Sequence, residues 1–460
     1  MCDRAKRGKS CAMTQSILRK ALLEARVPRY TSYPPATRFS QAVGADQHAA
    51  WLSTLPATEP VSLYAHIPFC RRLCWFCACR TQGTSNAAPL TRFLQTLNAE
   101  MRLVETAIGR RQTVSALHLG GGTPTLMEAF QIKALSDAFR AHFDLSQDPE
   151  ISVEIDPTEL DETRLDALVD FGLNRASIGV QDFDPKVQEA IGRLQSAEIT
   201  AEAVTGLRVR GVKSVNFDLL YGLPYQTPER LSATLAKVLD HKPDRLALYG
   251  YAHVPWVAKR QKLIPEEALP DPSARRELAE LAQATLVAAG YVPIGIDHYA
   301  LPKDSMARSA EAGTLRRNFQ GYTTDTASAL ISMGPSAISR FEGGYSQNAS
   351  ATRDWTRAVE TGLFATSRGF TLSREDIMVA DAIERLMCDG RIDFARMAER
   401  HGLRAQALRD RAEAALADLP EIGTLSGDRL AINEMAYARL LAARLDPELE
   451  SSDGRFSLAS

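Results

Sequence analysis

The stretch HIPFCRRLCWFCACR, residues 66–80, contains four cysteines, at Cys70, Cys74, Cys77 and Cys79. The chain has 460 residues and only seven cysteines, and the other three are scattered. This distribution does not suit a disulfide framework and favours a reducing compartment, where clustered thiols more often bind a metal. The stretch follows an apolar run, SLYAHI (62–67), that is typical of a β-strand. We therefore expect the cysteines in a loop after a first strand.

Six short β-rich runs recur along the chain, each followed by a longer amphipathic stretch. The runs are 62–67, 115–122, 151–156, 175–181, 214–220 and 245–251. Buried strands that alternate with helices predict a parallel sheet built from βα units. Six successive units suit a partial barrel better than a doubly wound sheet, which stays an alternative. The predicted fold class is α/β, with a partial TIM-like (β/α)6 barrel over residues 61–300.

Polar or glycine residues stand at the C-terminal ends of five of these runs. They are Gly120 to Thr123, Glu154, Gln181, Asp218 and Tyr251. In a parallel barrel these strand ends meet at one rim, where ligands bind. A helix N-cap would explain any one of them, but five in succession favour a shared site.

Three further parts are expected around the barrel. Residues 1–60 form an N-terminal extension, residues 301–370 a connection that completes the barrel, and residues 371–460 a mostly helical domain. In the last part three helices precede a two-stranded wing near 423–432 and a final helix at 435–445. This order is winged-helix-like, but the mixed surface charge favours a structural cap over nucleic-acid binding.

Composition argues against several classes of protein. The net charge is −2, without the basic excess of nucleic-acid or membrane-surface binders. No apolar run has the length of a membrane span, and the start MCDRAKRGKSCAM lacks the apolar stretch of a signal peptide. We expect a cytoplasmic monomer. We interpret the start as a tail, or as preceding the true first residue at Met13, and assign no role to Cys2 and Cys11.

The spacing C-x3-C-x2-C-x-C admits three interpretations. Four thiolates can close a zinc site, but structural zinc sites usually draw ligands from two separated segments, and Cys388 stands alone in a helix. Three thiolates can instead bind three irons of a cubane iron–sulfur cluster and leave its fourth iron open. A purely structural group of thiols is the weakest interpretation, because the loop follows a strand end on the expected rim.

C-x3-C-x2-C after a first strand resembles the signature of the radical S-adenosylmethionine enzymes. HLGGGTPT (118–125), one βα unit later, resembles the glycine-rich turn of that superfamily. Further segments narrow the resemblance to the oxygen-independent coproporphyrinogen III oxidase family, from about residue 29 to residue 445. They are RYTSYPPATRF (29–39), VEIDP (153–157), GVQDF (179–183), FDLLYGLP (217–224), YAHVP (251–255), RNFQGYTT (317–324) and GPSAIS (334–339).

The resemblance implies a 4Fe–4S cluster ligated by Cys70, Cys74 and Cys77, and two molecules of S-adenosylmethionine. The first molecule would contact Tyr64, Gly121, Glu154 and Ile338. The second would contact Phe76, Gly122, Thr123, Gln181, Arg193, Asp218 and Ala252. Tyr64 and Cys79 are expected beside the reacting groups, and Cys79 is either a spare thiol that the family needs or a fourth metal ligand.

The implied reaction is the anaerobic oxidative decarboxylation of two propionates of coproporphyrinogen III to vinyl groups, which gives protoporphyrinogen IX in haem biosynthesis. The electron donor and acceptor are unidentified. Arginine pairs well with carboxylates, so we expect Arg26, Arg29 and Arg38 to help bind the propionates, in a segment folded over the barrel mouth.

Two other functions stay open. A haem-carrying paralogue of the same fold usually has an aromatic residue in place of Cys79 and lacks the RYTSYP segment, and a radical methyltransferase would use the second S-adenosylmethionine as methyl donor. The chain also departs from the family pattern at AIGRLQS (190–196), where glycine replaces a bulkier polar residue, at ACRT (78–81) and in its C-terminal helix.

Overall fold

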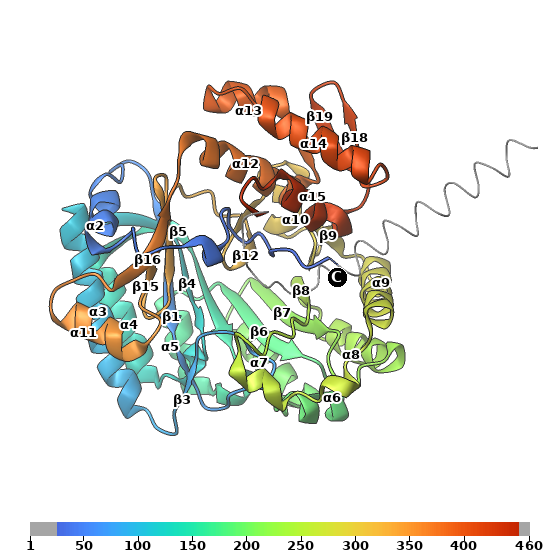
Figure 1. The fold of residues 1–460 in the computed structure, drawn as a ribbon. Coiled ribbons are helices and arrows are strands. Elements are labelled where there is room, and N and C mark those ends of the chain that lie inside the picture. Colours follow the sequence, from blue (N-terminus) through green and yellow to red (C-terminus); the bar gives the residue numbers. More distant parts are fainter. Residues whose placement is uncertain (1–24, 450–460) are drawn as a thin grey trace, which may run out of the picture. The chain divides into compact units, whose positions relative to one another are not determined.

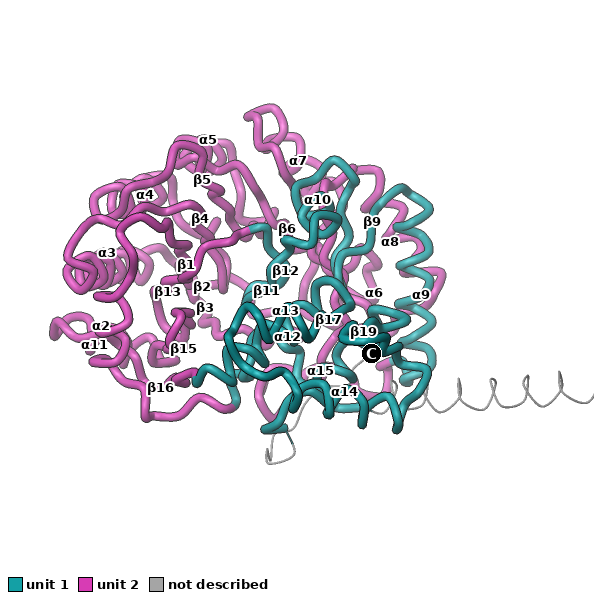
Figure 2. The backbone as a smooth tube through the Cα atoms, turned by 90° about the horizontal axis from the view of Figure 1, so that it is seen from above, with its two compact units in different colours: residues 1–37, 270–324, 373–460 teal, residues 38–269, 325–372 magenta. Residues whose placement is uncertain are grey.

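The computed structural model describes residues 25–449, which leaves Cys2, Cys11 and Met13 outside the described part. Two compact units make up the chain (Figure 2). Unit 2 comprises residues 38–269 and 325–372, and unit 1 takes the described residues before 38, between 270 and 324, and from 373 onward. Each of these units joins stretches that are separated along the chain. The four-part division expected from the sequence stays a prediction.

Unit 2 contains the six expected parallel strands. They are β1 (Val61–Ile67), β4 (Gln112–Gly121), β5 (Phe143–Ile155), β6 (Arg175–Gln181), β7 (Ser214–Tyr221) and β8 (Arg245–Gly250). They lie side by side in this order, all parallel (Figure 1). A doubly wound sheet would reverse its strand order partway, so the continuous order confirms barrel-type winding.

Helices follow the strands of unit 2 in sequence and lie along the outer side of its sheet (Figure 1). They are α3 (Ala88–Ile108), α4 (Ala129–His142), α5 (Glu162–Phe171), α6 (Pro185–Ala190), α7 (Ala197–Val209) and α8 (Pro228–Asp240). Several begin at a polar side chain that accepts a backbone N–H of the first turn, as Asp161, Ser196 and Thr227 do. These caps satisfy donors that a helix leaves unpaired, and they fix where each helix begins.

Side chains of the barrel strands alternate between an apolar and a polar face. In β6, Ala176, Ile178 and Val180 are buried, whereas Ser177 and Gln181 lie on the opposite face. The same alternation in the other strands gives that face Tyr64, His66, His118, Ser152, Glu154, Asn216 and Asp218. The period of two residues thus extends the polar lining from the strand ends, where the sequence predicted it, into the strands themselves.

The sheet continues beyond β1 on the side away from β4. Strand β13 (Leu330–Met333) pairs with β1 in parallel, and β14 (Ile338–Phe341), β15 (Gly344–Asn348) and β16 (Thr366–Thr371) follow in antiparallel pairs. Ser40 and Gly369 of β16 form a bridge in which each backbone N–H donates to the other carbonyl at 2.8 Å. The edge strand of this unit is therefore partly covered by its own chain.

Unit 1 is mostly helical, with short strand pairs. Its helices are α9 (Pro272–Ala288), α10 (Ser305–Glu311), α12 (Arg374–Asp389), α13 (Phe394–His401), α14 (Gln406–Asp418) and α15 (Ala438–Leu445). Its hairpins are β9 (Val292–Ile294) with β10 (His298–Ala300) and β11 (Arg316–Asn318) with β12 (Gly321–Thr323). No helix among residues 25–449 is long and apolar enough to cross a membrane.

The wing of unit 1 has three strands, and the expected two-stranded wing was wrong in this respect. Strand β19 (Arg429–Ile432) pairs with β18 (Gly423–Ser426) and also with β17 (Arg391–Asp393). Three residues between two helices are too few to show strand alternation in a sequence. The N-terminal segment also joins this unit, because Arg439 donates to the carbonyls of Val27 at 2.7 Å and Pro28 at 3.1 Å.

We expect the stability of unit 2 to depend on pH through His48 of helix α2 (Ala45–Ser53). His48 is buried with Nδ1 2.6 Å from Ser346 Oγ, and burial lowers its pKa to about 4. An unfolded histidine has a pKa of about 6.5 and gains a proton first, so stability is lost as the pH falls from about 6.5 to about 4, by up to about 3 kcal/mol. The glutamine in His48→Gln does not titrate, so its free energy of unfolding should fall less with acid than that of the wild type, by up to this amount. Urea unfolding at each pH measures both. Parallel pH profiles of the two proteins would contradict the assignment.

Candidate active site

Strand register brings the polar residues of unit 2 into rows. Tyr64 lies beside His118, and His118 lies beside Ser152. In the next row Glu154 lies beside Ser177, and Ser177 beside Asn216. Gly179 and Asp218 are partners in a third row. Residues far apart in the sequence therefore meet on one face of the five neighbouring strands β1, β4, β5, β6 and β7.

Tyr64 is connected to the cysteine loop through His66. The Tyr64 hydroxyl lies 3.0 Å from His66 Nδ1, and His66 Nε2 lies 2.9 Å from the carbonyl of Arg80. A carbonyl can only accept, so Nε2 carries the proton and Nδ1 accepts from the tyrosine. Burial lowers the pKa of His66, which keeps the ring neutral in this arrangement. Tyr64 is thereby oriented by the residue that follows Cys79.

Glu154 is held as a carboxylate at the end of β5. It accepts the Gly121 N–H at 2.9 Å, and His118 Nε2 lies 3.4 Å from its other oxygen. Burial raises the pKa of Glu154, but the hydrogen bonds from His118 and Gly121 outweigh it and lower the pKa below its usual value. The side chain keeps 40% exposure, so its remaining lone pairs can accept from an ammonium group or a hydroxyl.

The glycine-rich turn after β4 is bonded to the chain entering the cysteine loop. Gly122 N–H donates to the Ile67 carbonyl at 2.8 Å, and Thr123 N–H donates to the Phe69 carbonyl at 2.7 Å. A Cβ atom at position 122 would lie 2.5 Å from the Phe69 oxygen, which no side chain tolerates. Glycine is required here because two backbones approach closely.

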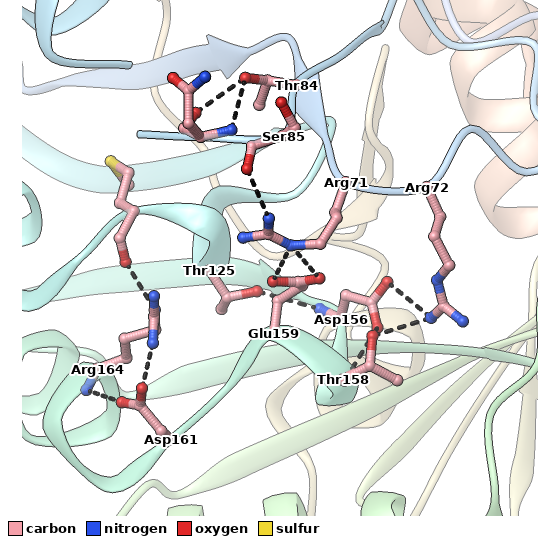
Figure 3. A network of polar contacts seen from close by, with 12 residues as sticks. Arg71, Arg72, Thr84, Ser85, Thr125, Asp156, Thr158, Glu159, Asp161 and Arg164 are labelled. Atoms are coloured by element: carbon pink, nitrogen blue, oxygen red, sulfur yellow. Dashed lines mark hydrogen bonds and ion pairs between the residues drawn. The ribbon is translucent and has the colours of Figure 1, made fainter. Parts of the chain in front are cut away.

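Two arginines anchor the cysteine loop to the segment after β5, as Figure 3 shows. Arg71 Nε donates to both carboxylate oxygens of Glu159, at 2.9 and 3.0 Å. Arg72 donates to Thr158 Oγ1 at 2.9 Å and lies 3.7 Å from Asp156. The loop is thus fixed by side chains from a different βα unit.

Arg193 joins Asp156 to the cysteine loop. Its Nη1 lies 3.3 Å from Asp156 Oδ2 and 3.6 Å from Cys74 Sγ, and its Nη2 donates to the Gly179 carbonyl at 2.8 Å. Burial raises the pKa of Asp156, but the charges of Arg193 and Arg72 and the hydrogen bonds from Thr158 together outweigh burial and hold that pKa below its usual value. A buried cation therefore stands beside one of the predicted cluster ligands.

The glycine in AIGRLQS that departs from the family pattern has a structural reason. Gly192 has a φ of 65°, and a Cβ atom there would lie 2.8 Å from the Trp75 ring. The backbone N–H of Trp75 donates to the carbonyl of Ile191, the residue before Gly192, at 2.9 Å. The cysteine loop packs so closely on this turn that only glycine fits without a shift.

The four clustered cysteines are free thiols, as is Cys388 among the residues described. Burial raises the pKa of Cys70 to about 11, and the hydrogen bond from Cys79 lowers that of Cys77 to about 7. The backbone N–H of Cys79 also donates to Cys77 Sγ at 3.4 Å. Arg260 lies near these thiols and lowers both pKa values. Donors and cations around sulfur suit thiolate ligands.

The four clustered thiols are compatible with the iron–sulfur cluster that the sequence predicts. Within residues 25–449, no three His, Cys, Asp or Glu side chains are grouped so that they could hold one metal ion. A 4Fe–4S cluster takes each thiolate on a different iron, so its ligands need not converge on one point. The thiols of one loop, with a buried arginine beside Cys74, fit such a group.

Gln181 and Arg193 converge above Gly179. A Cβ atom at Gly179 would lie 3.2 Å from Arg193 Nη2 and 3.3 Å from Gln181 Nε2. Gln181 itself has a φ of 68°, a conformation rare for residues other than glycine and common at functional sites. Asp218, the strand partner of Gly179, accepts from Ser177 at 2.9 Å and from Asn216 at 2.8 Å. It lies within β7, which excludes the helix-cap interpretation.

Phe76 and Ala252 are linked through a residue that sequence analysis did not single out. The side-chain amide of Gln261 donates to the carbonyl of Phe76 at 2.7 Å and to that of Ala252 at 3.1 Å. Ile338 begins β14 and lies further along the sheet, after Gly334, where a Cβ atom would lie 2.5 Å from the His66 carbonyl oxygen. Most of the predicted site residues are therefore connected by contacts, and Ile338 is linked only indirectly.

Four residues of the candidate site besides Gln261 were missed: His66, His118, Asp156 and Arg260. Strand alternation could have found the first, because His66 stands two residues after Tyr64 and shares its face. Asp156 was part of the quoted VEIDP segment but had no assigned partner. Nothing in the sequence relates Arg260 to residues 79 and 81, which it contacts from about 180 positions away.

Comparison with known proteins gives the class first. Residues 64–238 match the Radical SAM superfamily, and the loop of three spaced cysteines on a parallel barrel is that of a radical S-adenosylmethionine enzyme. Such enzymes bind a 4Fe–4S cluster and S-adenosylmethionine.

The relatives narrow this class. The chain is 52% identical over 390 residues to an oxygen-independent coproporphyrinogen III oxidase of Paracoccus denitrificans, covering 85% of this chain and 86% of the relative. It is 47% identical to the anaerobic coproporphyrinogen III oxidase 1 of Cereibacter sphaeroides, covering 98% and 99%. The solved coproporphyrinogen III oxidase of Escherichia coli matches with a TM-score of 0.87 and 35% identity, over 92% of this chain and all of that one. The chain belongs to the oxygen-independent coproporphyrinogen III oxidase family.

We expect Asp156→Asn to destabilise the protein more than Glu159→Gln. Asp156 and Arg193 keep only 11% and 10% side-chain exposure, so removing one charge leaves the other buried and costs about 3 kcal/mol. Arg71, the partner of Glu159, is 45% exposed, and this pair contributes about 1 kcal/mol or less. Urea unfolding measures both free energies. Equal losses in the two variants would show that the Asp156 pair is not the stronger anchor.

Proposed function

We propose that the protein catalyses the oxygen-independent oxidation of coproporphyrinogen III to protoporphyrinogen IX. The observation that carries this proposal is near-full-length similarity to proteins named for that activity, together with a free-thiol loop anchored beside a polar strand face. We expect the protein to act as a cytoplasmic monomer in haem biosynthesis. Its electron donor and acceptor are unidentified.

Cys70, Cys74 and Cys77 are the proposed cluster ligands. The first S-adenosylmethionine is assigned to Tyr64, Gly121, Glu154 and Ile338. Glu154 is ionised and partly exposed, as a partner of the methionine ammonium or a ribose hydroxyl must be. The hydrogen bond to His66 fixes the orientation of the Tyr64 hydroxyl.

A second S-adenosylmethionine is assigned to the other side of the polar face. Its contacts are Phe76, Gly122, Thr123, Gln181, Arg193, Asp218 and Ala252. Arg193 suits a carboxylate, and Asp218 suits an ammonium or ribose group. The convergence of Gln181 and Arg193 over Gly179, beside Asp218, supports a common ligand for these residues.

A 4Fe–4S cluster held by Cys70, Cys74 and Cys77 would supply the electron that cleaves S-adenosylmethionine to methionine and a deoxyadenosyl radical, and this radical would take a hydrogen atom from a substrate propionate. The protein's own residues hold the reactants and keep water from the reaction. The neutral His66 maintains the Tyr64 contact, and the buried Arg193 places positive charge next to Cys74. Loss of CO2 from that substrate propionate and of one electron to the acceptor would then leave a vinyl group, and repetition on a second propionate would give the second vinyl group.

The deciding experiment is anaerobic turnover. The reconstituted and reduced protein receives S-adenosylmethionine and coproporphyrinogen III, and 5′-deoxyadenosine, CO2 and protoporphyrinogen IX are measured together. We expect the three products to rise in step. Deoxyadenosine without CO2 would indicate that the enzyme acts on a different substrate, and a methylated product would indicate a methyltransferase. Stoichiometric haem binding without deoxyadenosine would support the haem-carrier alternative.

Cys79→Ser separates the two roles left open for Cys79. If Cys70, Cys74 and Cys77 are the ligands, this variant should keep its iron and sulfide content, whereas Cys70→Ser should lose most of it. Turnover should fall in both variants, since Cys79 is assigned beside the reacting groups. Iron analysis and the absorbance of the cluster provide the measurement. Loss of iron from Cys79→Ser would make Cys79 a fourth ligand.

We also propose that Arg26, Arg29 and Arg38 help bind the substrate propionates. Arg29→Ala should raise the KM for coproporphyrinogen III about tenfold while leaving iron content unchanged, because one charge-assisted pair is removed. Steady-state kinetics with the cluster quantified in each sample measures this. Unchanged kinetics would exclude Arg29 from substrate binding.

A further inference from the structure

Gln261 is a buried side chain that the assigned chemistry does not use. It lies in the short 3-10 helix η4 (Lys259–Leu263) and is 1% exposed. Its Nε2 donates to the carbonyls of Phe76 at 2.7 Å and Ala252 at 3.1 Å, and its Oε1 accepts the Val254 N–H at 2.5 Å. Both N–H groups of this amide thus donate to main-chain carbonyls, and these two carbonyls belong to separate segments.

The two segments that Gln261 connects do not adjoin in the sequence. Phe76 belongs to the cysteine loop, between Cys74 and Cys77, whereas Ala252 follows the end of β8. The neighbouring Arg260 makes a second connection, donating to Thr81 Oγ1 at 2.8 Å and to the Cys79 carbonyl at 3.3 Å. The helix η4 therefore fastens the cysteine loop to the region after β8 from outside the loop.

Burial makes the Gln261 contacts hard to replace. Water cannot reach a side chain that is 1% exposed, so loss of the amide would leave two main-chain carbonyls without their donor. The cysteine loop has other anchors, at Arg71, Arg72 and Trp75, that do not involve Gln261. Removal of the amide should therefore release Phe76 from Ala252 while the thiols stay in place.

We propose that Gln261 is a positioning residue for the second S-adenosylmethionine. It sets the separation of Phe76 and Ala252, and with it the space that this ligand would occupy between them. This inference rests on the proposed function, which assigns Phe76 and Ala252 to that molecule. The side-chain hydrogen bonds of Gln261 go to main-chain groups, so it acts on the ligand through Phe76 and Ala252.

Gln112 offers a matched control in the same unit. It is also 1% exposed, and its amide nitrogen donates to two main-chain carbonyls, of Pro56 at 3.0 Å and Glu59 at 2.6 Å. It begins β4, at the opposite end of the strand from the glycine-rich turn. Gln112→Met therefore removes the same kind of contact as Gln261→Met, but at the far end of the sheet.

The test is equilibrium binding of S-adenosylmethionine to the cluster-loaded, unreduced protein without oxygen, so that no cleavage occurs. The wild type and Gln112→Met should bind two molecules per chain. Gln261→Met should keep its iron and bind one molecule normally and the second about tenfold or more weakly. Two unchanged affinities in Gln261→Met, or equal weakening in Gln112→Met, would overturn the inference. One molecule per wild-type chain would overturn the two-molecule assignment as well.

A second variant tests the positioning role if Gln261→Met folds poorly. Gln261→Glu keeps the shape, but as a carboxylate it cannot donate to Phe76 or Ala252. Protonation restores one donor, and burial brings the pKa of such a carboxyl towards neutrality. Affinity for the second molecule, relative to the wild type at each pH, should improve as the pH falls from about 8.5 to about 6.5. An affinity ratio that does not change with pH would overturn the inference.

Discussion

Side chains along a β-strand point to alternate faces, and the site of this protein depends on that constraint. Buried apolar residues such as Leu117, Ile178 and Phe217 leave every second position of the strands for polar groups on the other face. Parallel register then lines these positions up across β1, β4, β5, β6 and β7. A slip of one residue would exchange the two faces, so the apolar packing also specifies which polar groups meet.

The cysteine loop is placed by the rest of unit 2 rather than by its own conformation. Groups after β5, before α7 and in η4 reach it through Glu159, Asp156, Arg193 and Gln261. These anchors differ in strength, because some pairs are buried and others are open to solvent. Positive charge near the sulfur atoms comes from Arg193 and Arg260, which belong to separate elements. The chain thus orders a short loop from several sides at once.

The sequence was sufficient for the strand order of the barrel and for the cysteine loop, since both follow from local patterns and motif spacing. Other features depend on contacts between distant positions. Nothing in the sequence distinguishes Gln261 from a glutamine on the surface. Gly192 departs from the family pattern, and the sequence does not show that Trp75 packs against it. Strand β17 was missed because three residues carry no periodicity. The cluster ligands and both assigned S-adenosylmethionine contacts stay predictions.

The bridge between Ser40 and Gly369 bears on how copies of this chain behave at high concentration. A sheet that ends in a bare strand offers main-chain donors and acceptors to any similar strand, and such pairing starts aggregation. Here the segment leading into α2 occupies part of that margin of β16. The protection costs no extra element, because the same residues connect the N-terminal segment to unit 2. Loss of the Ser40–Gly369 bridge would therefore be expected to lower the solubility of the protein at high concentration.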